Sequence, residues 1–182
     1  MTFEKTVTLK DGRNCLLRNG VTSDGKAVLD VFNRTHEETD YLLTYSDENC
    51  FTASQEADFL QRKTDSANNV EIIAVVDDVV AGTAGIDALG MRDKIKHRAV
   101  FGIAITKEFW GLGIGKYLME ACIECAREAG YLQLELEVVA ENERAVEMYR
   151  RAGFIEYGRN PKAFRLRTGE YQELIDMRLE LK

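Results

Sequence analysis

The sequence predicts a protein of the α/β class, in which helices cover a central β-sheet. Patterns with the period of a strand and of a helix follow one another along the chain. The clearest strand is LQLELEVV, residues 132–139, where apolar and polar residues alternate strictly. The clearest helix follows residue 113, where apolar residues recur at intervals of three and four. Together these patterns favour a mixed α/β fold.

The first third of the chain predicts one strand and two helices. Residues 13–18 have the composition of a strand, and residues 23–38 carry an apolar stripe at helical spacing. A second, shorter helix is expected over residues 54–64. Residues 36–52, between the helices, are polar and aromatic without a period, so we expect an irregular connection there.

A β-hairpin and a buried strand are expected in the middle of the chain. Residues 71–89 contain two apolar runs joined at Asp77 and Asp78, which are residue types that tolerate hairpin-turn backbone angles. The run from Ala99 to Ile105 is apolar throughout, and this favours a strand covered on both faces.

The last third predicts the end of the long helix, a further helix and two strands. Gly130 is placed to end the helix that starts after residue 113, and a further helix is expected from a cap at Asn142 to Gly153. FIEYG, residues 154–158, and ELIDMRLEL, residues 173–181, are strand candidates separated by a charged loop.

Length and composition favour one soluble domain over residues 1–182. The chain has one proline, and it has no Gly/Ser linker, internal repeat or low-complexity tract. It contains no apolar run of about 18 residues and no secretory signal, so we expect a cytoplasmic protein. The four cysteines are then expected as free thiols. Cys122 and Cys125 lie in a helical pattern without further zinc ligands, which favours a structural role and no metal site.

The net charge of the chain limits the classes of partner that it is expected to bind. A net charge of −7 argues against binding to nucleic acid or to an anionic membrane, because both need a clustered basic face. A small or cationic partner is easier to accommodate.

The segment TKEFWGLGIGKYL, residues 106–118, places three glycines between a strand and a helix. It does not fit the dinucleotide motif GxGxxG, because Lys116 stands where the third glycine is required. It does not fit the phosphate-binding motif GxxxxGK[ST] either, since Trp110 and Tyr117 replace the first glycine and the final hydroxyl residue. A backbone cradle for an anion at the helix start, or a tight turn alone, remains.

A second motif gives the glycine turn its context. In NERAVEMYRRAGF, residues 142–154, Asn142, Ala145, Tyr149, Gly153 and Phe154 are spaced along one helix and its end. With the VVDDVVAG hairpin, the FGIAIT strand and WGLGIG, this order resembles the GNAT superfamily of acyl-CoA-dependent N-acetyltransferases. The resemblance runs from about residue 70 to the C-terminus. Trp110 departs from the family pattern, which usually has Arg or Gln at that position.

The resemblance implies a mixed, mostly antiparallel sheet of six or seven strands with about four helices, splayed between strands four and five, which would be residues 97–106 and 132–139. Acetyl-CoA would enter the splay as co-substrate. The residues that the resemblance implies for binding it are Ile103, Ala104, Ile105, Gly111, Leu112, Gly113, Ile114, Gly115, Lys116 and Asn142. Tyr149 would be catalytic, as the acid that protonates the departing thiolate.

The general base and the acceptor are left open. Many relatives use a glutamate near the position of Val100, and this strand has no acid, so His97, Glu37, Tyr45 or water are candidates. In the family, specificity usually comes from segments that correspond to residues 36–52 and 158–172. The acids of the first segment would attract a cationic amine or form a solvated surface.

We therefore expect an N-acetyltransferase that moves an acetyl group from acetyl-CoA to a primary amine, in a small molecule or at a peptide N-terminus. Attack by the amine would be direct, and no metal is implied. The alternative is a non-catalytic acyl-CoA-binding sensor with the same fold. A homodimer is possible.

Overall fold

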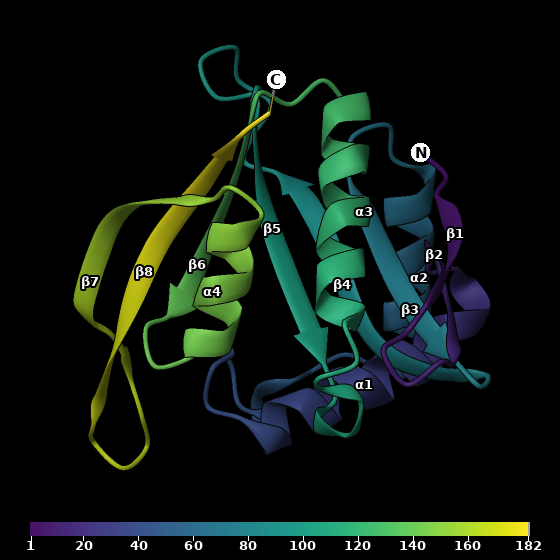
Figure 1. Cartoon of the computed structure of the whole chain (residues 1–182), viewed down its shortest axis with the longest axis horizontal. Helices are drawn as coiled ribbons and strands as arrows, with labels where there is room; N and C mark the ends of the chain where they lie inside the picture. The colour runs from purple at the N-terminus through teal and green to yellow at the C-terminus, as the bar shows by residue number, and fades with distance from the viewer. Residues whose placement is uncertain (182) are drawn as a thin grey trace.

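The computed structural model describes residues 1–181 and is organised around an eight-stranded sheet (Figure 1). The strand order is β1-β2-β3-β4-β5-β6-β8-β7. Neighbouring strands are antiparallel except β5 and β6, which are parallel. The strands are β1 (Glu4–Thr8), β2 (Asn14–Asn19), β3 (Val70–Val76), β4 (Val79–Ala88), β5 (Arg98–Ile105), β6 (Gln133–Val139), β7 (Ile155–Arg165) and β8 (Tyr171–Glu180).

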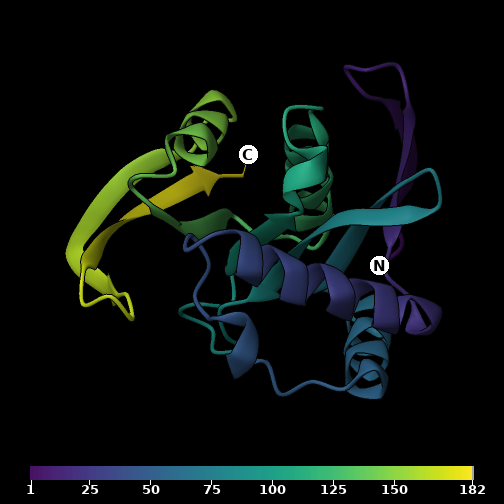
Figure 2. The same ribbon diagram turned by 90° about the horizontal axis from the view of Figure 1, so that it is seen from below.

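Helices cover both faces of this sheet, as Figure 2 shows in a view along the layers. The long helices are α1 (Gly25–Glu38), α2 (Ala53–Asp65), α3 (Ile114–Glu128) and α4 (Glu143–Arg151). The short 3₁₀ helices are η1 (Thr22–Asp24), η2 (Ser46–Glu48) and η3 (Lys107–Phe109). The larger hydrophobic core lies on the α3 and α4 side, and a smaller one, centred on Val28, Leu60 and Ile73, joins α1 and α2 to the sheet. The predicted α/β fold is confirmed.

The predicted hairpin is present, with β3 and β4 paired around Asp77 and Asp78. Both residues have positive φ, 49° and 63°. A two-residue turn with positive φ at both central positions matches the right-handed twist of the strands, and Asp is one of the few residue types that tolerates it.

β5 differs from the expectation that both of its faces are covered. Val100 is 39% exposed and Gly102 is also exposed, whereas Ala99 and Phe101 are buried. The reason is that α1 crosses the sheet at the C-terminal end of β5 and leaves its first half bare on that side (Figure 1). An apolar run therefore does not by itself show that both faces are buried.

Two further expectations need correction. The strand predicted over residues 13–18 is β2, and a preceding strand, β1, was missed because its residues are mostly exposed and its conformation comes mainly from pairing with β2. The sheet therefore has one strand more than expected, and the expected loop 158–172 is largely strand. β7 continues to Arg165, with breaks in register around Pro161 that an edge strand tolerates.

β5 and β6 part soon after they start, as predicted for the two splayed strands. Only three residue pairs join them, Arg98 with Gln133, Ala99 with Leu134 and Val100 with Glu135. From Phe101 onward, β5 remains paired with β4 on its other side. The edge of β5 that faces β6 is thus free over its second half.

A buried charged cluster lies between α2 and the sheet, away from this opening. The Lys63 ammonium is 2.5 Å from a carboxylate oxygen of Asp87 and 3.9 Å from one of Glu71, and it donates to the Ile86 carbonyl. Burial raises the pKa of Glu71 to about 7, although Lys63 opposes this shift. The pKa of the neighbouring Glu56 is also raised by burial.

Cys122 and Cys125 are buried in α3, and together with Cys15 and Cys50 they are free thiols, as predicted. Burial raises the pKa of both Cys122 and Cys125. Within residues 1–181, no helix has the length and apolar character needed to cross a membrane.

Candidate active site

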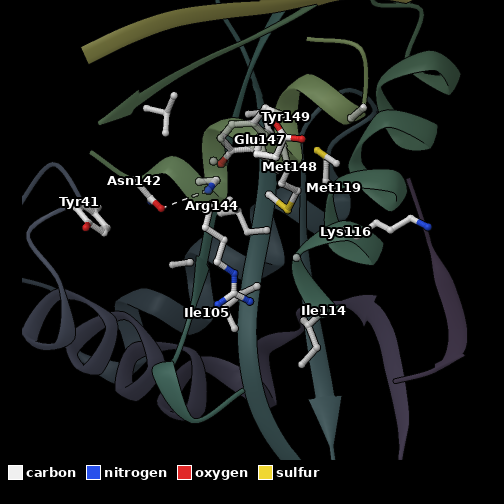
Figure 3. Close-up of a pocket in the computed structure, with 18 of the residues that line it drawn as sticks. Tyr41, Ile105, Ile114, Lys116, Met119, Asn142, Arg144, Glu147, Met148 and Tyr149 are labelled. Atoms are coloured by element: carbon white, nitrogen blue, oxygen red, sulfur yellow. Dashed lines mark hydrogen bonds between the residues drawn. The ribbon is translucent and has the colours of Figure 1, made fainter. Parts of the chain in front are cut away.

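The parting of β5 and β6 opens into a cavity of about 1310 Å³. Its walls come from the free half of β5, the glycine turn, one side of α3 and of α4 along most of their lengths, part of β6, and the segment after α1. In Figure 3, Tyr41 lies on one side of this cavity and Lys116 on the other, with Asn142 and Tyr149 between them. Drug-sized ligands occupy about 300–1,000 Å³, so this cavity has room for a large ligand and a second, smaller one.

The glycine turn presents backbone N–H groups at the start of α3. Gly113 is the N-cap, with a φ of 97°, and no side chain caps the helix. The N–H groups of Ile114, Gly115 and Lys116 belong to the first turn, which has no acceptor within the helix. Gly111 also has positive φ, 88°, so the turn depends on glycine at two positions. These donors, at the positive end of the helix dipole, suit an anion.

Trp110 anchors the turn to β5. Its indole Nε1–H donates to the Ile105 carbonyl, with the two atoms 2.6 Å apart. The guanidinium of Arg144 lies 5.6 Å from the indole centroid, and Figure 3 shows the Arg144 side chain reaching from α4 toward Ile105. The aromatic residue that departs from the usual pattern therefore ties the turn to the free strand edge and contacts α4 across the opening.

Tyr149 is held rigidly in the wall of the cavity. Its ring packs edge-on against Phe101, with centroids 6.1 Å apart, and against Phe154 at 5.8 Å. Its side chain is almost fully buried, and this burial raises its pKa, so the phenol keeps its proton at neutral pH. A neutral phenol in this position is a proton donor.

Asn142 caps α4, as predicted, because its Oδ1 accepts from the Ala145 N–H at 3.4 Å. The side chain also lines the cavity. Its amide NH₂ donates no hydrogen bond to residues 1–181 and is available to a ligand.

Glu137 is a cavity residue to which sequence reasoning gave no role. It lies on β6, two residues beyond the last pair with β5, and its exposed side chain borders the cavity. Its neighbour Glu135 is instead buried in an ion pair with Arg98. The alternation of LQLELEVV places both acids on the same face of β6, and the end of the β5–β6 pairing at Glu135 is what separates their surroundings.

The predicted binding residues are brought together with one exception. Ile103, Ala104, Ile105, Gly111, Gly113, Ile114, Gly115, Lys116 and Asn142 all line the cavity, and so does Tyr149. Leu112 does not line it, and its carbonyl accepts from the Lys10 N–H. The Lys116 ammonium lies 3.6 Å from the Glu120 carboxylate, along α3.

The candidate bases named from the sequence lie elsewhere. His97 and Glu37 are not among the residues that line the cavity, and Tyr45 lines a smaller neighbouring pocket. Two acids between residues 36 and 52 already form contacts within the protein. Glu38 accepts from the Lys107 N–H and pairs with Arg34, and Glu48 accepts from the Tyr45 N–H.

Comparison with known proteins decides the family. Residues 30–154 match the model of the Acetyltransferase (GNAT) family, a span that includes β3 to β6, the glycine turn and α4. The chain belongs to the GNAT acetyltransferase family.

A curated relative and solved structures with similar folds are also acetyltransferases. This GNAT chain is 31% identical over 118 residues to the L-amino acid N-acetyltransferase AaaT of Escherichia coli (strain K12), covering 64% of this chain and 72% of that protein. The structure of a GNAT-family acetyltransferase from Streptococcus pneumoniae superposes with a TM-score of 0.87 at 27% identity, covering 91% of this chain and 99% of that one.

A third neighbour, YncA from Salmonella typhimurium, a putative acetyltransferase described with its cofactor acetyl-CoA, superposes with a TM-score of 0.82. It is 16% identical and covers 93% of this chain and 95% of that one.

Proposed function

We propose that this GNAT protein transfers the acetyl group of acetyl-CoA to a primary amine by direct attack of the amine. The observation that carries the proposal is the parting of β5 and β6, which leaves a free strand edge beside a cavity that also contains the glycine turn and Tyr149. Acetyl-CoA supplies the activated acetyl thioester. The cytoplasm is the compartment we propose.

The residues present fit acetyl-CoA as co-substrate. Ile103, Ala104 and Ile105 line the opening along the edge of β5 that β6 leaves unpaired, and this edge offers backbone groups to the amides of the pantetheine arm, although the Ile105 carbonyl already accepts from the Trp110 indole. The N–H groups at the start of α3 suit its pyrophosphate. The bound co-substrate in the Salmonella neighbour is consistent with this assignment, since that protein shares the fold.

Tyr149 and Glu137 take the two proton-transfer roles in this proposal. Tyr149, whose phenol lines the cavity and keeps its proton, donates that proton to the departing thiolate, although burial raises its pKa and so makes it a weaker acid than a solvated tyrosine. Glu137, on the strand opposite the free edge of β5, accepts the proton that the amine must lose, directly or through a water. In this proposal Glu137 on β6 takes the role of the glutamate that many relatives carry near the position of Val100 on β5.

Kinetics of single variants test these roles. Tyr149→Phe should lower kcat by about 10²–10⁴-fold, the usual contribution of a general acid, with little change in KM for acetyl-CoA. Glu137→Gln should lower kcat/KM for the amine, whereas the exposed Glu141→Gln, two residues after β6 ends, is the matched control and should leave it unchanged. Unchanged turnover in either active-site variant would remove that residue from the mechanism.

A further inference from the structure

The β1–β2 hairpin contacts the glycine turn at the start of α3 (Figure 1). The Lys10 N–H, in the turn of the hairpin, donates to the Leu112 carbonyl at 3.2 Å. The Tyr117 hydroxyl donates to the Thr8 carbonyl at 3.3 Å. The hairpin precedes the span 30–154 that matches the family model. A part of the chain outside that span therefore holds the glycine turn in place.

The side chain of Lys10 runs along the glycine turn and lines the active-site cavity. Its Cγ and Cε each lie 4.0 Å from the position that a Cβ on Gly113 would occupy. Gly113 is the N-cap of α3, so the ammonium group, one bond beyond Cε, lies next to the start of this helix. The hairpin thus adds a cation at the end of the cavity where the proposed pyrophosphate would bind.

No carboxylate of residues 1–181 lies at ion-pair distance from the Lys10 ammonium group. The neighbouring Asp11 is held by Arg13 instead, because its carboxylate accepts from the Arg13 N–H at 3.1 Å and from the Arg13 side chain at 2.8 Å. The first turn of α3 contains no acid. It does contain Lys116, whose ammonium group is 3.6 Å from the Glu120 carboxylate. The charge of Lys10 is therefore left without a partner beside a second lysine.

This gathering of positive charge is unfavourable in the free protein. The N-terminus of a helix carries a partial positive charge, which disfavours nearby cations and favours anions. Lys10 and Lys116 add two full charges at this end of α3, although the net charge of the chain is −7. An anion that carries more than one negative charge would offset the repulsion, and a pyrophosphate diester carries two.

We propose that Lys10 binds the pyrophosphate of acetyl-CoA and that the β1–β2 hairpin forms one side of the site that holds it. The inference rests on the proposed function and adds a binding residue from outside the family match. It also accounts for Leu112, whose carbonyl would repel a phosphate group. The Lys10 N–H occupies this carbonyl, while the Lys10 side chain supplies a donor to the same end of the cavity.

Calorimetric titration of acetyl-CoA into single variants tests the role of Lys10. Lys10→Met keeps the length of the side chain and the backbone N–H but removes the charge, so the affinity should fall by about tenfold, as expected for one charge-assisted hydrogen bond. Lys5→Met is the matched control, because Lys5 is exposed on β1 of the same hairpin and lies outside the cavity lining. Equal affinities in the two variants would overturn the inference.

The stability of the free protein separates a binding role from a structural one. Because a cation is disfavoured at the start of α3, Lys10→Met should leave Tm unchanged or raise it slightly. Lys10→Glu should raise Tm and weaken acetyl-CoA binding further than Lys10→Met does. A clear fall of Tm in Lys10→Met together with its loss of affinity would assign Lys10 to the folding of the hairpin and overturn the inference.

Dephospho-CoA identifies the phosphate group that Lys10 contacts. This ligand keeps the pyrophosphate of CoA and lacks the 3′-phosphate, so Lys10→Met should weaken its binding by the same factor as the binding of CoA. A loss confined to CoA would place Lys10 at the 3′-phosphate and overturn the assignment to the pyrophosphate.

Turnover of primary amines by the parent protein separates this inference from the proposed reaction. Weaker binding of acetyl-CoA by Lys10→Met, without acetylation of any amine by the parent protein, would support the inference and refute the proposed transfer. Acetylation by the parent protein with unchanged affinity in Lys10→Met would overturn the inference and leave the transfer intact. A parent protein that does not bind acetyl-CoA would overturn both.

Discussion

The buried Glu71 carboxyl predicts an unusual dependence of stability on pH. Its pKa is about 7 in the folded protein against 4.5 in its model state, because burial disfavours the charged form. The folded state therefore binds this proton more tightly than the unfolded chain does. The stabilisation is fully present below pH 4.5 and is lost as the pH rises toward 7.

The raised pKa of Glu71 sets the size of the change in the free energy of unfolding with pH. Each pKa unit corresponds to 1.36 kcal/mol, and part of the loss has already occurred at pH 5, so the free energy of unfolding should fall by about 2–3 kcal/mol between pH 5 and pH 8 through this group. For a chain of this length that is about 4–12 °C in Tm. Glu71→Gln, which is neutral throughout, should raise Tm relative to the parent protein at pH 8 and leave it nearly unchanged at pH 5.

Thermal unfolding followed by circular dichroism at both pH values measures this difference. Glu128→Gln, an exposed carboxylate at the end of α3, is the control and should shift Tm equally at pH 5 and pH 8. A Glu71→Gln protein that gains no more stability at pH 8 than at pH 5 would refute the argument, and it would mean that Lys63 keeps Glu71 ionised in the folded state.

Three further predictions test the geometry of the active site. Asn142→Ala should lower the free energy of unfolding by about 0.5–2 kcal/mol because the cap of α4 is lost. Asn142→Ser should restore the stability but not the affinity for acetyl-CoA, and full affinity in both variants would remove Asn142 from the binding site. Gly113→Ala places a Cβ at a φ of 97° and should weaken acetyl-CoA binding in calorimetry more than Gly130→Ala, which places a Cβ at a φ of 80° at the far end of α3, away from the cavity. Equal losses of affinity would contradict the role of the turn. Because Trp110 is the single tryptophan and contacts both Ile105 and Arg144, acetyl-CoA should change its fluorescence, and Arg144→Gln should alter the signal of the free protein; no change on saturation with acetyl-CoA would place the ligand away from the strand edge.

Local patterns predicted most of the fold, and tertiary contacts explain the rest. The alternation of LQLELEVV and the Asp77–Asp78 turn were readable because the residues themselves favour those backbone states. β1 was missed because its mostly exposed residues carry no apolar period, and its conformation comes from hydrogen bonds to β2. The cover of β5 was misjudged because it depends on where α1 crosses the sheet.

The residues of the candidate site also fall into those that local motifs predicted and those that only tertiary contacts explain. The glycine turn, Asn142 and Tyr149 lie in local motifs, and the structure brings them to one cavity. The place of Glu137 beside the cavity and the contact between Arg144 and Trp110 depend on segments whose proximity no local pattern encodes. A single sequence shows that an acid lies on β6, and only the parting of β5 and β6 shows that it borders the cavity.

The most direct test of the proposed reaction is to incubate the protein with acetyl-CoA and a panel of primary amines, and to measure released CoA and acetylated amine in the same samples. The account predicts equal amounts of both products, no acetylated protein in mass spectra taken during turnover, and loss of turnover in Tyr149→Phe. Tight binding of acetyl-CoA with no acetylated amine across the panel would contradict it and would favour a non-catalytic acyl-CoA-binding module.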